Sequence, residues 1–256
     1  IGKEISHIED ATMDDVKAFF KKHYNPSNAI MVVTGNVETA EVKRLAEKWF
    51  EPIPAIDKPK RNLPVEPEQT EHRAITVERD VPIDSIYKAF HMCSRYDEDY
   101  HTTDVVSDIL SRGNSSRLYK ALIKEKKLFS DISAYVMGDM DKGLFVVSGK
   151  LSPGIAMADA EKAIEEELEK MKTTLVDANE LQKCKNKVES SLTFSETDIM
   201  TKATNLAISE LLGSADLINK EIDHYNKITV EDIQRVAKQV LRKENCSTLY
   251  YMAKKK

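Results

Sequence analysis

Histidine is the side chain in this sequence best suited to binding a metal ion, and its spacing decides whether it could do so. The chain has 6 histidines in 256 residues. No two of them are four residues apart, the spacing that turns two imidazoles toward one ion on a helix. They are His7, His23, His72, His91, His101 and His224. The histidine spacing therefore predicts no helical metal motif in this chain.

One short stretch gathers several potential metal ligands, including two of these histidines. It holds His91, Cys93, Asp97, Glu98 and His101. In a metal site, His91 and Cys93 on one face of a strand would have to meet His101 across a turn. The separation of these residues matches no recognised zinc-binding spacing. We interpret the stretch as a charged loop between a strand and a helix.

The residues Ser115, Ser116 and Arg117 raise the question of nucleophilic or anion-binding chemistry. No Gly-x-Ser-x-Gly sequence surrounds the serines, so a nucleophile elbow is not indicated, and helix capping explains them better. Arg117 could attract a substrate carboxylate, but a structural role at the start of a helix is the preferred interpretation. We therefore expect no catalytic, cofactor-binding or metal-binding residue in this chain.

The composition excludes several classes of function. Charged residues make up 32% of the chain and the net charge is −5, which favours neither nucleic acid nor an anionic membrane as a partner. No apolar run approaches the roughly 18 residues that a membrane helix needs. The 3 cysteines are far apart in the sequence, so we expect reduced thiols rather than a disulfide framework. The compartment stays open between cytoplasm and periplasm.

One stretch of the sequence occurs twice and predicts the elements that would position a functional site. Residues 11–33 return as residues 228–250, and a Thr stands three residues before an Asp in both copies. This pairing predicts a capping box at the start of a helix in each copy. Apolar residues follow at helical spacing, and a strand-like segment follows an Asn. The repeat predicts two copies of one domain, the first of which has lost its front.

Composition marks where the two copies are joined. Five of the 8 prolines lie between Pro52 and Pro67, and proline neither donates a backbone hydrogen bond nor varies its φ angle. We therefore expect residues 1–52 to be the C-terminal remnant of a first domain, residues 53–68 to be an extended linker, and residues 69–256 to be a complete second domain. Within the remnant we expect a strand at Ala29–Val33 and a helix at Thr39–Phe50.

The second domain reads as strands first, then helices, a hairpin, further helices and one late strand. This order predicts an α+β fold with a mostly antiparallel sheet backed by helices. Strands are expected at residues 72–78, 85–93, 131–137, 143–148 and 247–252. The charged run from Glu161 to Lys172 has mixed signs at helical spacing and is interpreted as a solvated helix face.

Four motifs, in this order and spacing, resemble the pitrilysin/insulinase family of zinc metallopeptidases, which includes the mitochondrial processing peptidases. They are Thr12 to Gly35 with Tyr24-x-Pro26-x-Asn28, residues 113–118 (Gly-Asn-Ser-Ser-Arg-Leu), residues 179–181 (Asn-Glu-Leu), and residues 228–232 (Ile-Thr-Val-Glu-Asp). The resemblance implies a pair of homologous α+β domains that enclose a chamber for unfolded peptides. It also implies zinc in the first domain, on a His-x-x-Glu-His motif that is absent here and would precede Ile1.

The sequence departs from the family at two positions that matter for catalysis. Family members often supply an Arg, and a Tyr seven residues later, to bind the substrate carbonyl and stabilise the developing oxyanion. Their places here are taken by Ile123 and Ser130. Our hypothesis is that the parent protein takes these groups from a partner subunit or is not a peptidase.

The predicted function is that of a non-catalytic C-terminal domain of a zinc-dependent peptidase-like protein, forming half of a peptide-holding chamber. The expected partners are a catalytic half or a homologous subunit, an unfolded peptide substrate, and a second copy of the chain as a homodimer. The alternative is a non-proteolytic assembly subunit or a peptide-binding module of the same fold.

Overall fold

The computed structural model describes residues 3–60 and 62–254, and it divides into two compact units. The first unit consists of Ile1–Val65 together with Thr193–Asn219, and the second of Glu66–Leu192 together with Lys220–Lys256. We call the second the sheet unit, because it contains every strand of the described chain. The segments 53–60 and 62–68, which were expected to be a linker, form neither helix nor strand.

The first unit is built from helices. Its N-terminal part holds α1 (Ser6–Glu9), α2 (Met13–His23), the short 3-10 turn Pro26–Asn28 and α3 (Thr39–Phe50). Its second part holds α7 (Ile199–Leu211) and a 3-10 turn at Ala215–Asn219. The predicted bounds of α3 are confirmed.

The predicted strand at Ala29–Val33 is wrong for the described chain, where this segment has no regular secondary structure. A strand requires a neighbouring backbone to complete its ladder of hydrogen bonds. The unit to which residues 29–33 belong contains no described strand that could pair with it. The sequence carries the apolar pattern of a strand, but this chain does not supply the pairing.

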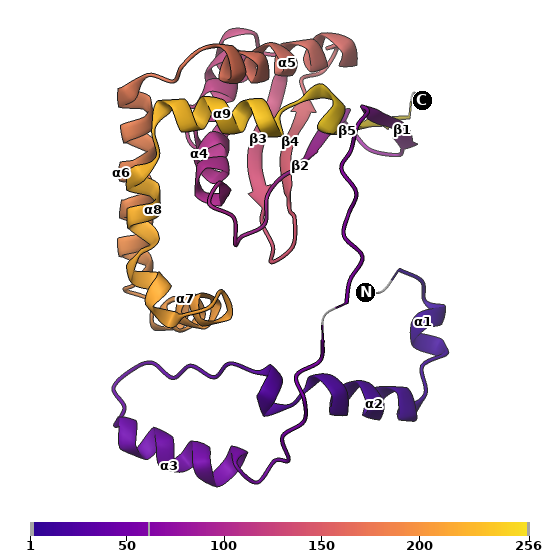
Figure 1. The fold of residues 1–256 in the computed structure, drawn as a ribbon. Coiled ribbons are helices and arrows are strands. Elements are labelled where there is room, and N and C mark those ends of the chain that lie inside the picture. The colour runs from indigo at the N-terminus through magenta and orange to yellow at the C-terminus, as the bar shows by residue number, and fades with distance from the viewer. Residues whose placement is uncertain (1–2, 61, 255–256) are drawn as a thin grey trace. The chain divides into compact units, whose positions relative to one another are not determined.

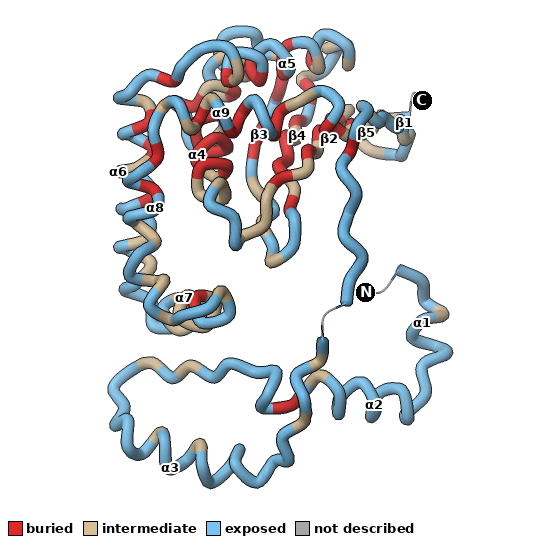
Figure 2. Tube along the Cα trace, viewed as in Figure 1, coloured by how far each residue is buried: buried red, intermediate tan, exposed pale blue. Residues whose placement is uncertain are grey.

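Much of the apolar surface of the first unit is exposed. Val16, Phe19 and Phe20 on α2 are 55 to 60% exposed, and Trp49 on α3 is 64% exposed. In Figure 2 the tube over α1, α2 and α3 is almost entirely pale blue. Large apolar side chains at helical spacing normally face a core, so this surface has the character of a face without its covering layer.

The sheet unit contains one five-stranded sheet in the order β1-β5-β2-β4-β3 (Figure 1). The strands are β1 (Arg73–Arg79), β2 (Ser85–His91), β3 (Phe129–Met137), β4 (Leu144–Leu151) and β5 (Cys246–Ala253). β1 and β5 are parallel, and the other neighbouring pairs are antiparallel. The α+β class with a mostly antiparallel sheet is therefore confirmed.

Helices pack on the sheet through a common hydrophobic core. They are α4 (Tyr100–Ser111), a π-helix at Tyr119–Glu125, α5 (Met157–Thr173), α6 (Ala178–Ser195), α8 (Glu221–Lys227) and α9 (Val230–Val240). The core joins Phe90 and Phe145 of the sheet to Ile109 of α4, Ile164 of α5 and Ile233 of α9. Figure 2 shows this buried material in red on α4 and β2 to β4.

The repeated unit has the same local structure in both copies. In each, the Thr side chain accepts from the backbone N–H of the Asp, and the Asp carboxylate accepts from the backbone N–H of the Thr. The capping boxes at Thr12/Asp15 and Thr229/Asp232 are thus confirmed. Each cap is followed by a helix of 11 residues. A 3-10 turn then leads into extended backbone, at Ala29 in one copy and Cys246 in the other.

No helix in the described part of the chain is long and apolar enough to cross a membrane.

Candidate functional site

The two faces of the sheet are covered very differently. Side chains alternate between the faces along each strand. Ile86, Phe90 and Phe145 point to the face packed against the helices and are at most 2% exposed. On the opposite face Tyr87 is 38% exposed and Tyr135 is 40% exposed, and neither belongs to the described core. We call this second face the open face.

The pairing register fixes which side chains lie next to one another on the open face. Paired residues on neighbouring strands place their side chains on the same side of the sheet. Four rows result, written in the strand order β1, β5, β2, β4, β3: Val77, Tyr251, Ser85, Lys150, Asp131; Ile75, Leu249, Tyr87, Ser148, Ser133; Arg73, Ser247, Ala89, Val146, Tyr135; and, on the last three strands alone, His91, Leu144, Met137.

The apolar side chains of these rows form one band across the sheet. The band begins on β1 and β5 in the first two rows and ends on β4 and β3 in the last two, so that it crosses all five strands diagonally. It consists of Val77, Tyr251, Ile75, Leu249, Tyr87, Ala89, Val146, Tyr135, Leu144 and Met137. We call these ten residues the apolar band. Val146, near its middle, is buried without belonging to the described core.

Polar residues occupy the two corners of the open face that the apolar band leaves free. In one corner the hydroxyls of Ser133 and Ser148 are 3.0 Å apart and form a hydrogen bond. In the other corner the Ser247 hydroxyl donates to the Gln69 side chain at 3.0 Å. These hydroxyls are satisfied within the chain, so the corners contrast chemically with the apolar band between them.

Two of the motifs singled out in the sequence meet in the sheet unit. Arg117 donates from Nε and Nη2 to the two carboxylate oxygens of Glu180, at 3.2 and 2.8 Å. Both side chains are about one-fifth exposed. A two-pronged pair of this kind fixes the orientation of the guanidinium. Arg117 therefore ties the segment before the π-helix to α6, in agreement with the structural interpretation of this residue.

The capping role predicted for Ser115 and Ser116 is wrong. The Ser115 hydroxyl accepts a hydrogen bond from Lys183 Nζ at 3.0 Å. The Ser116 hydroxyl is fully buried and has no hydrogen-bond partner in the described chain. At this helix start the orphan backbone groups are not bonded by the serine side chains, because Ser116 turns inward toward the core.

The two positions that replace the family's carbonyl-binding pair lie in different surroundings. Ile123, in the π-helix, packs against the hydrophobic core. Ser130, on β3, is exposed, and its hydroxyl donates to the Lys150 carbonyl at 3.2 Å. An isoleucine has no donor for an oxyanion, and the serine donor is used within the sheet.

The local group of potential metal ligands is spread over separate elements. His91 ends β2, and Cys93, Asp97 and Glu98 lie in the loop that follows it. His101 lies on α4 with Nε2 3.3 Å from the Glu221 carboxylate, and its ring stacks on His224 at 4.8 Å between centroids. Within residues 3–60 and 62–254, no three His, Cys, Asp or Glu side chains are arranged to hold a metal ion. The donor set of the described chain thus does not fit zinc.

A buried cation on the covered face was missed by the sequence analysis. Lys88 of β2 has a side chain that is 3% exposed, and its Nζ lies 2.6 Å from the Glu161 carboxylate and 3.1 Å from that of Glu165. Burial opposes ionisation of Glu161, but the hydrogen bond and charge of Lys88 lower the pKa of that carboxyl overall. Tyr250 also donates to Glu161 at 2.8 Å. The network ties α5 to the sheet.

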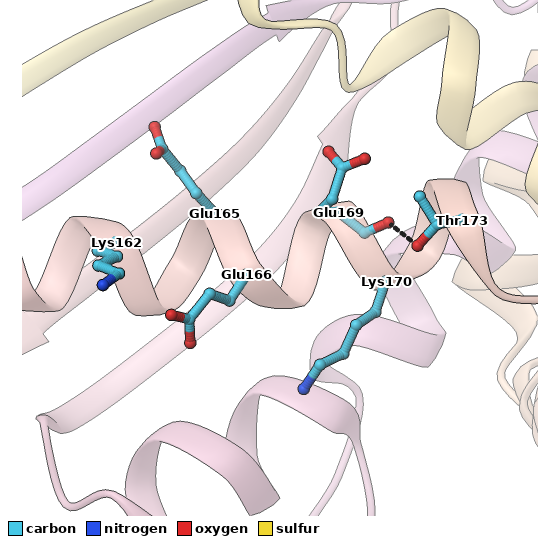
Figure 3. A pocket seen from close by; sticks show the side chains of 6 residues that line it. All are labelled: Lys162, Glu165, Glu166, Glu169, Lys170 and Thr173. Carbon is cyan, nitrogen blue, oxygen red and sulfur yellow. Dashed lines mark hydrogen bonds between the residues drawn. The ribbon is translucent and has the colours of Figure 1, made fainter.

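This finding corrects the interpretation of residues 161–172 as a wholly solvated face. Glu161 and Glu165 pair with Lys88, and Glu167 is 4% exposed. The Glu165 side chain is still 54% exposed, and most other charged side chains of α5 also reach solvent. Figure 3 shows six side chains there, lining a shallow hollow: Lys162, Glu165, Glu166, Glu169, Lys170 and Thr173. Acidic and basic side chains thus alternate along the solvent-exposed side of this helix.

The described chain thus contains an α+β domain with an open five-stranded sheet, helices packed on one face and Arg117 paired with Glu180. Residues 10–188 match the family described as the peptidase M16 inactive domain. The chain belongs to this family.

Individual relatives agree with this assignment. The zinc protease PqqE of Helicobacter pylori is 27% identical over 250 residues, which cover 95% of this chain and 55% of that protein. An uncharacterised zinc protease of Bacillus subtilis, YmxG, is 21% identical over 90% of this chain and 56% of its own length. The chain therefore spans about half the length of the curated relatives it matches.

Solved structures give the same fold. The crystal structure of a protease from Helicobacter pylori superposes with a TM-score of 0.89 at 25% identity, covering 97% of this chain and 61% of that one. The peptidase M16 inactive domain from Pseudomonas fluorescens gives a TM-score of 0.84 at 16% identity, covering 98% of this chain and 60% of that one. The second likeness concerns the fold alone.

Proposed function

We propose that this chain is the non-catalytic half of a zinc-dependent peptidase-like protein and that the open face of its sheet forms one wall of a chamber holding unfolded peptides. The observation that carries the proposal is the apolar band on the open face of a domain of the inactive M16 class. Small and medium apolar surfaces with a few polar groups at their edge suit peptide ligands.

We further propose that residues 1–52 belong to a preceding catalytic-type domain, which would bind the zinc. Their helix α2 repeats α9 down to its capping box. Ile233 and Val236 of α9 are buried, whereas Val16 and Phe19, their counterparts in α2, are exposed. A layer equivalent to the one that covers α9 would bury the exposed face.

The alternative is a non-proteolytic assembly subunit or peptide-binding module of the same fold. Ile123 and Ser130 favour it, because neither can stabilise an oxyanion in the way that the family's Arg and Tyr do. Under the leading proposal, a catalytic partner or homologous subunit would supply these groups.

Reconstitution tests the proposal. The 256-residue chain is mixed with a separately produced catalytic half of the parent, or with a homologous zinc-bearing subunit, and cleavage of an unfolded peptide is followed with and without a zinc chelator. Chelator-sensitive cleavage by the mixture, absent from either component, supports the proposal. A stable complex that cleaves nothing supports the assembly subunit, and metal-dependent cleavage by this chain alone contradicts both. Light scattering of the chain alone tests whether it forms a homodimer.

A further inference from the structure

Helix α8 is attached to α4 through a group of titratable side chains. His101 Nε2 of α4 lies 3.3 Å from the Glu221 carboxylate, and these two side chains are 15% and 31% exposed. The His101 ring also stacks on that of His224, with 4.8 Å between the centroids and 8° between the planes. The Tyr225 hydroxyl donates to Asp104 Oδ2 at 2.8 Å. We call these five residues the α4–α8 contact.

The α4–α8 contact lies where the chain returns to the sheet unit. Residues 193–219, which include α7, belong to the first unit, and the chain re-enters the sheet unit at Lys220, directly before α8. Helix α8 is thus the first element of the sheet unit after this excursion. The α4–α8 contact therefore fastens the returning chain to the rest of the sheet unit.

We propose that the α4–α8 contact is controlled by protons and is strongest when His101 and His224 together carry one positive charge. Histidine changes its charge between about pH 5 and pH 8, and two interacting histidines titrate as a pair. One charge is attracted to the Glu221 carboxylate and stacks on a neutral ring. Two charges on rings 4.8 Å apart repel each other, and with no charge the carboxylate lacks its cation. The returning chain is therefore held most firmly near about pH 6.

The other titratable groups beside the two histidines keep their charge over this pH range. Burial alone would raise the pKa of Glu221, but the hydrogen bond and charge of His101 lower it overall, so the carboxylate stays ionised. Burial raises the pKa of Tyr225 and of Tyr100 above its ordinary value, so both phenols stay neutral. The bond from Tyr225 therefore persists while the histidines titrate. On α8 the exposed charges are of both signs: Asp223 and Lys227.

The neighbouring elements make a second imidazolium charge unfavourable. Arg95, in the loop before α4, already places positive charge near Glu221. Lys185 of α6 donates to a backbone carbonyl of α8 at 2.8 Å. Asp99, at the start of α4, is paired with Arg235 of α9 at 2.7 Å and is thus neutralised within that pair. Two carboxylates belong to the α4–α8 contact, so a second imidazolium would give it a surplus of positive charge.

Hydrogen–deuterium exchange of the 256-residue chain between about pH 5 and pH 8.5 tests the proposal. Protection factors, from which the intrinsic pH dependence of exchange is removed, are compared for a peptide covering α8 and one covering α9. Because α9 packs in the core, the ratio of the two factors separates opening of α8 from changes in overall stability. We expect this ratio to pass through a maximum between about pH 5.5 and pH 7 and to fall about five-fold on either side. A flat or steadily rising or falling ratio overturns the proposal.

Matched variants assign the two sides of the maximum to particular groups. His224→Gln leaves one imidazole, which cannot take a second charge, so the fall on the acidic side should disappear. Glu221→Gln removes the attraction for the first charge, so the fall on the alkaline side should disappear. His101→Gln should abolish both. His72→Gln, which removes a histidine bonded to Thr248 on β5, is the control and should keep the maximum.

Circular dichroism checks that each variant is folded. A maximum that persists in folded His101→Gln overturns the proposal, as does its loss in folded His72→Gln. If a variant does not fold, the profile of the unaltered chain still decides, because a single maximum requires that the first and second protons have opposite effects.

Discussion

Asn28 and Asn245 make the same side-chain hydrogen bond at positions 217 residues apart (245 − 28). Nδ2 of Asn28 donates to the His23 carbonyl at 3.0 Å, and Nδ2 of Asn245 donates to the Val240 carbonyl at 2.8 Å. Asn245 also donates to the carbonyl of His91, at the end of β2, at 2.9 Å. The second copy of the repeat thus uses the same amide both to close its helix and to fasten that helix to the sheet.

Replacing Asn245 with Ala should lower the free energy of unfolding of the sheet unit by about 2 kcal/mol, because it leaves the Val240 and His91 carbonyls without this donor in a buried place. Asn28→Ala is the matched control. Asn28 is exposed, so water can replace its bond and we expect a loss below about 0.5 kcal/mol. Urea unfolding followed by far-ultraviolet circular dichroism measures both. If both variants lost the same free energy of unfolding, the proposed difference between the buried and the exposed asparagine would be contradicted.

Lys127 is the one described residue other than glycine with a positive φ angle, 54°. A side chain is strained in this left-handed conformation, and glycine is not. Lys127→Gly should therefore raise the unfolding free energy by about 0.5 kcal/mol, after the extra chain entropy of glycine is subtracted. Lys124→Gly, within the π-helix, should lower it by about 1 kcal/mol. Thermal melts of the two variants should shift in opposite directions, and a loss in both would refute the argument.

Gly149 makes room for an aromatic ring on the covered face of the sheet. A Cβ atom at this position would lie 2.6 Å from the Phe129 ring, which is 2% exposed. Gly149→Ala should thus cost about 1 to 3 kcal/mol of stability through overpacking. The double variant Gly149→Ala with Phe129→Leu should lose less than the sum of the two single changes, because the smaller side chain removes the overlap. Strict additivity in chemical denaturation would argue against this contact.

Local features of the fold could be predicted because they depend on neighbouring residues. The two capping boxes follow from a Thr placed three residues before an Asp, and the bounds of α3 follow from one amphipathic stretch. The α+β class follows from the order of strand and helix patterns. The diagonal course of the apolar band could not be predicted, because it depends on which strands are neighbours and on their register.

Two predictions were wrong for identifiable physical reasons: the solvated acidic run on α5 and the strand at Ala29–Val33. Lys88 alternates in phase with Ile86 and Phe90, so its place on the buried face could have been recognised, together with its need for a carboxylate partner. The acidic run on α5 was instead interpreted as solvated. For Ala29–Val33 the apolar pattern is that of a strand, but a strand needs a second segment to pair with, and the described part of this unit contains no strand.

The ion pair between Lys88 and Glu161 should make stability depend on pH. Lys88 Nζ and Glu161 Oε1 are 2.6 Å apart, and both side chains are largely buried. Glu161→Gln should lower the unfolding free energy by about 2 kcal/mol near neutral pH, less than the cost of orphaning a buried charge, because Glu165 still neutralises Lys88. Glu166→Gln, which breaks the exposed pair with Lys126, is the matched control and should change the free energy of unfolding much less, because solvent screens that pair.

The direction of the pH effect follows from the pKa of Glu161 in the folded chain. Although burial alone would raise it, the bond from Lys88 holds this pKa below the ordinary value of 4.5. The folded state therefore binds this proton less readily than the unfolded state, and the contribution of the pair is complete above pH 4.5 and lost as the pH falls through the lowered pKa. The stability difference between the unaltered chain and Glu161→Gln should accordingly stay constant from pH 7 down to about pH 5 and shrink in more acidic solution. Urea titrations across this range measure it, and a difference that grew on acidification would mean that Glu161 is not held ionised by Lys88.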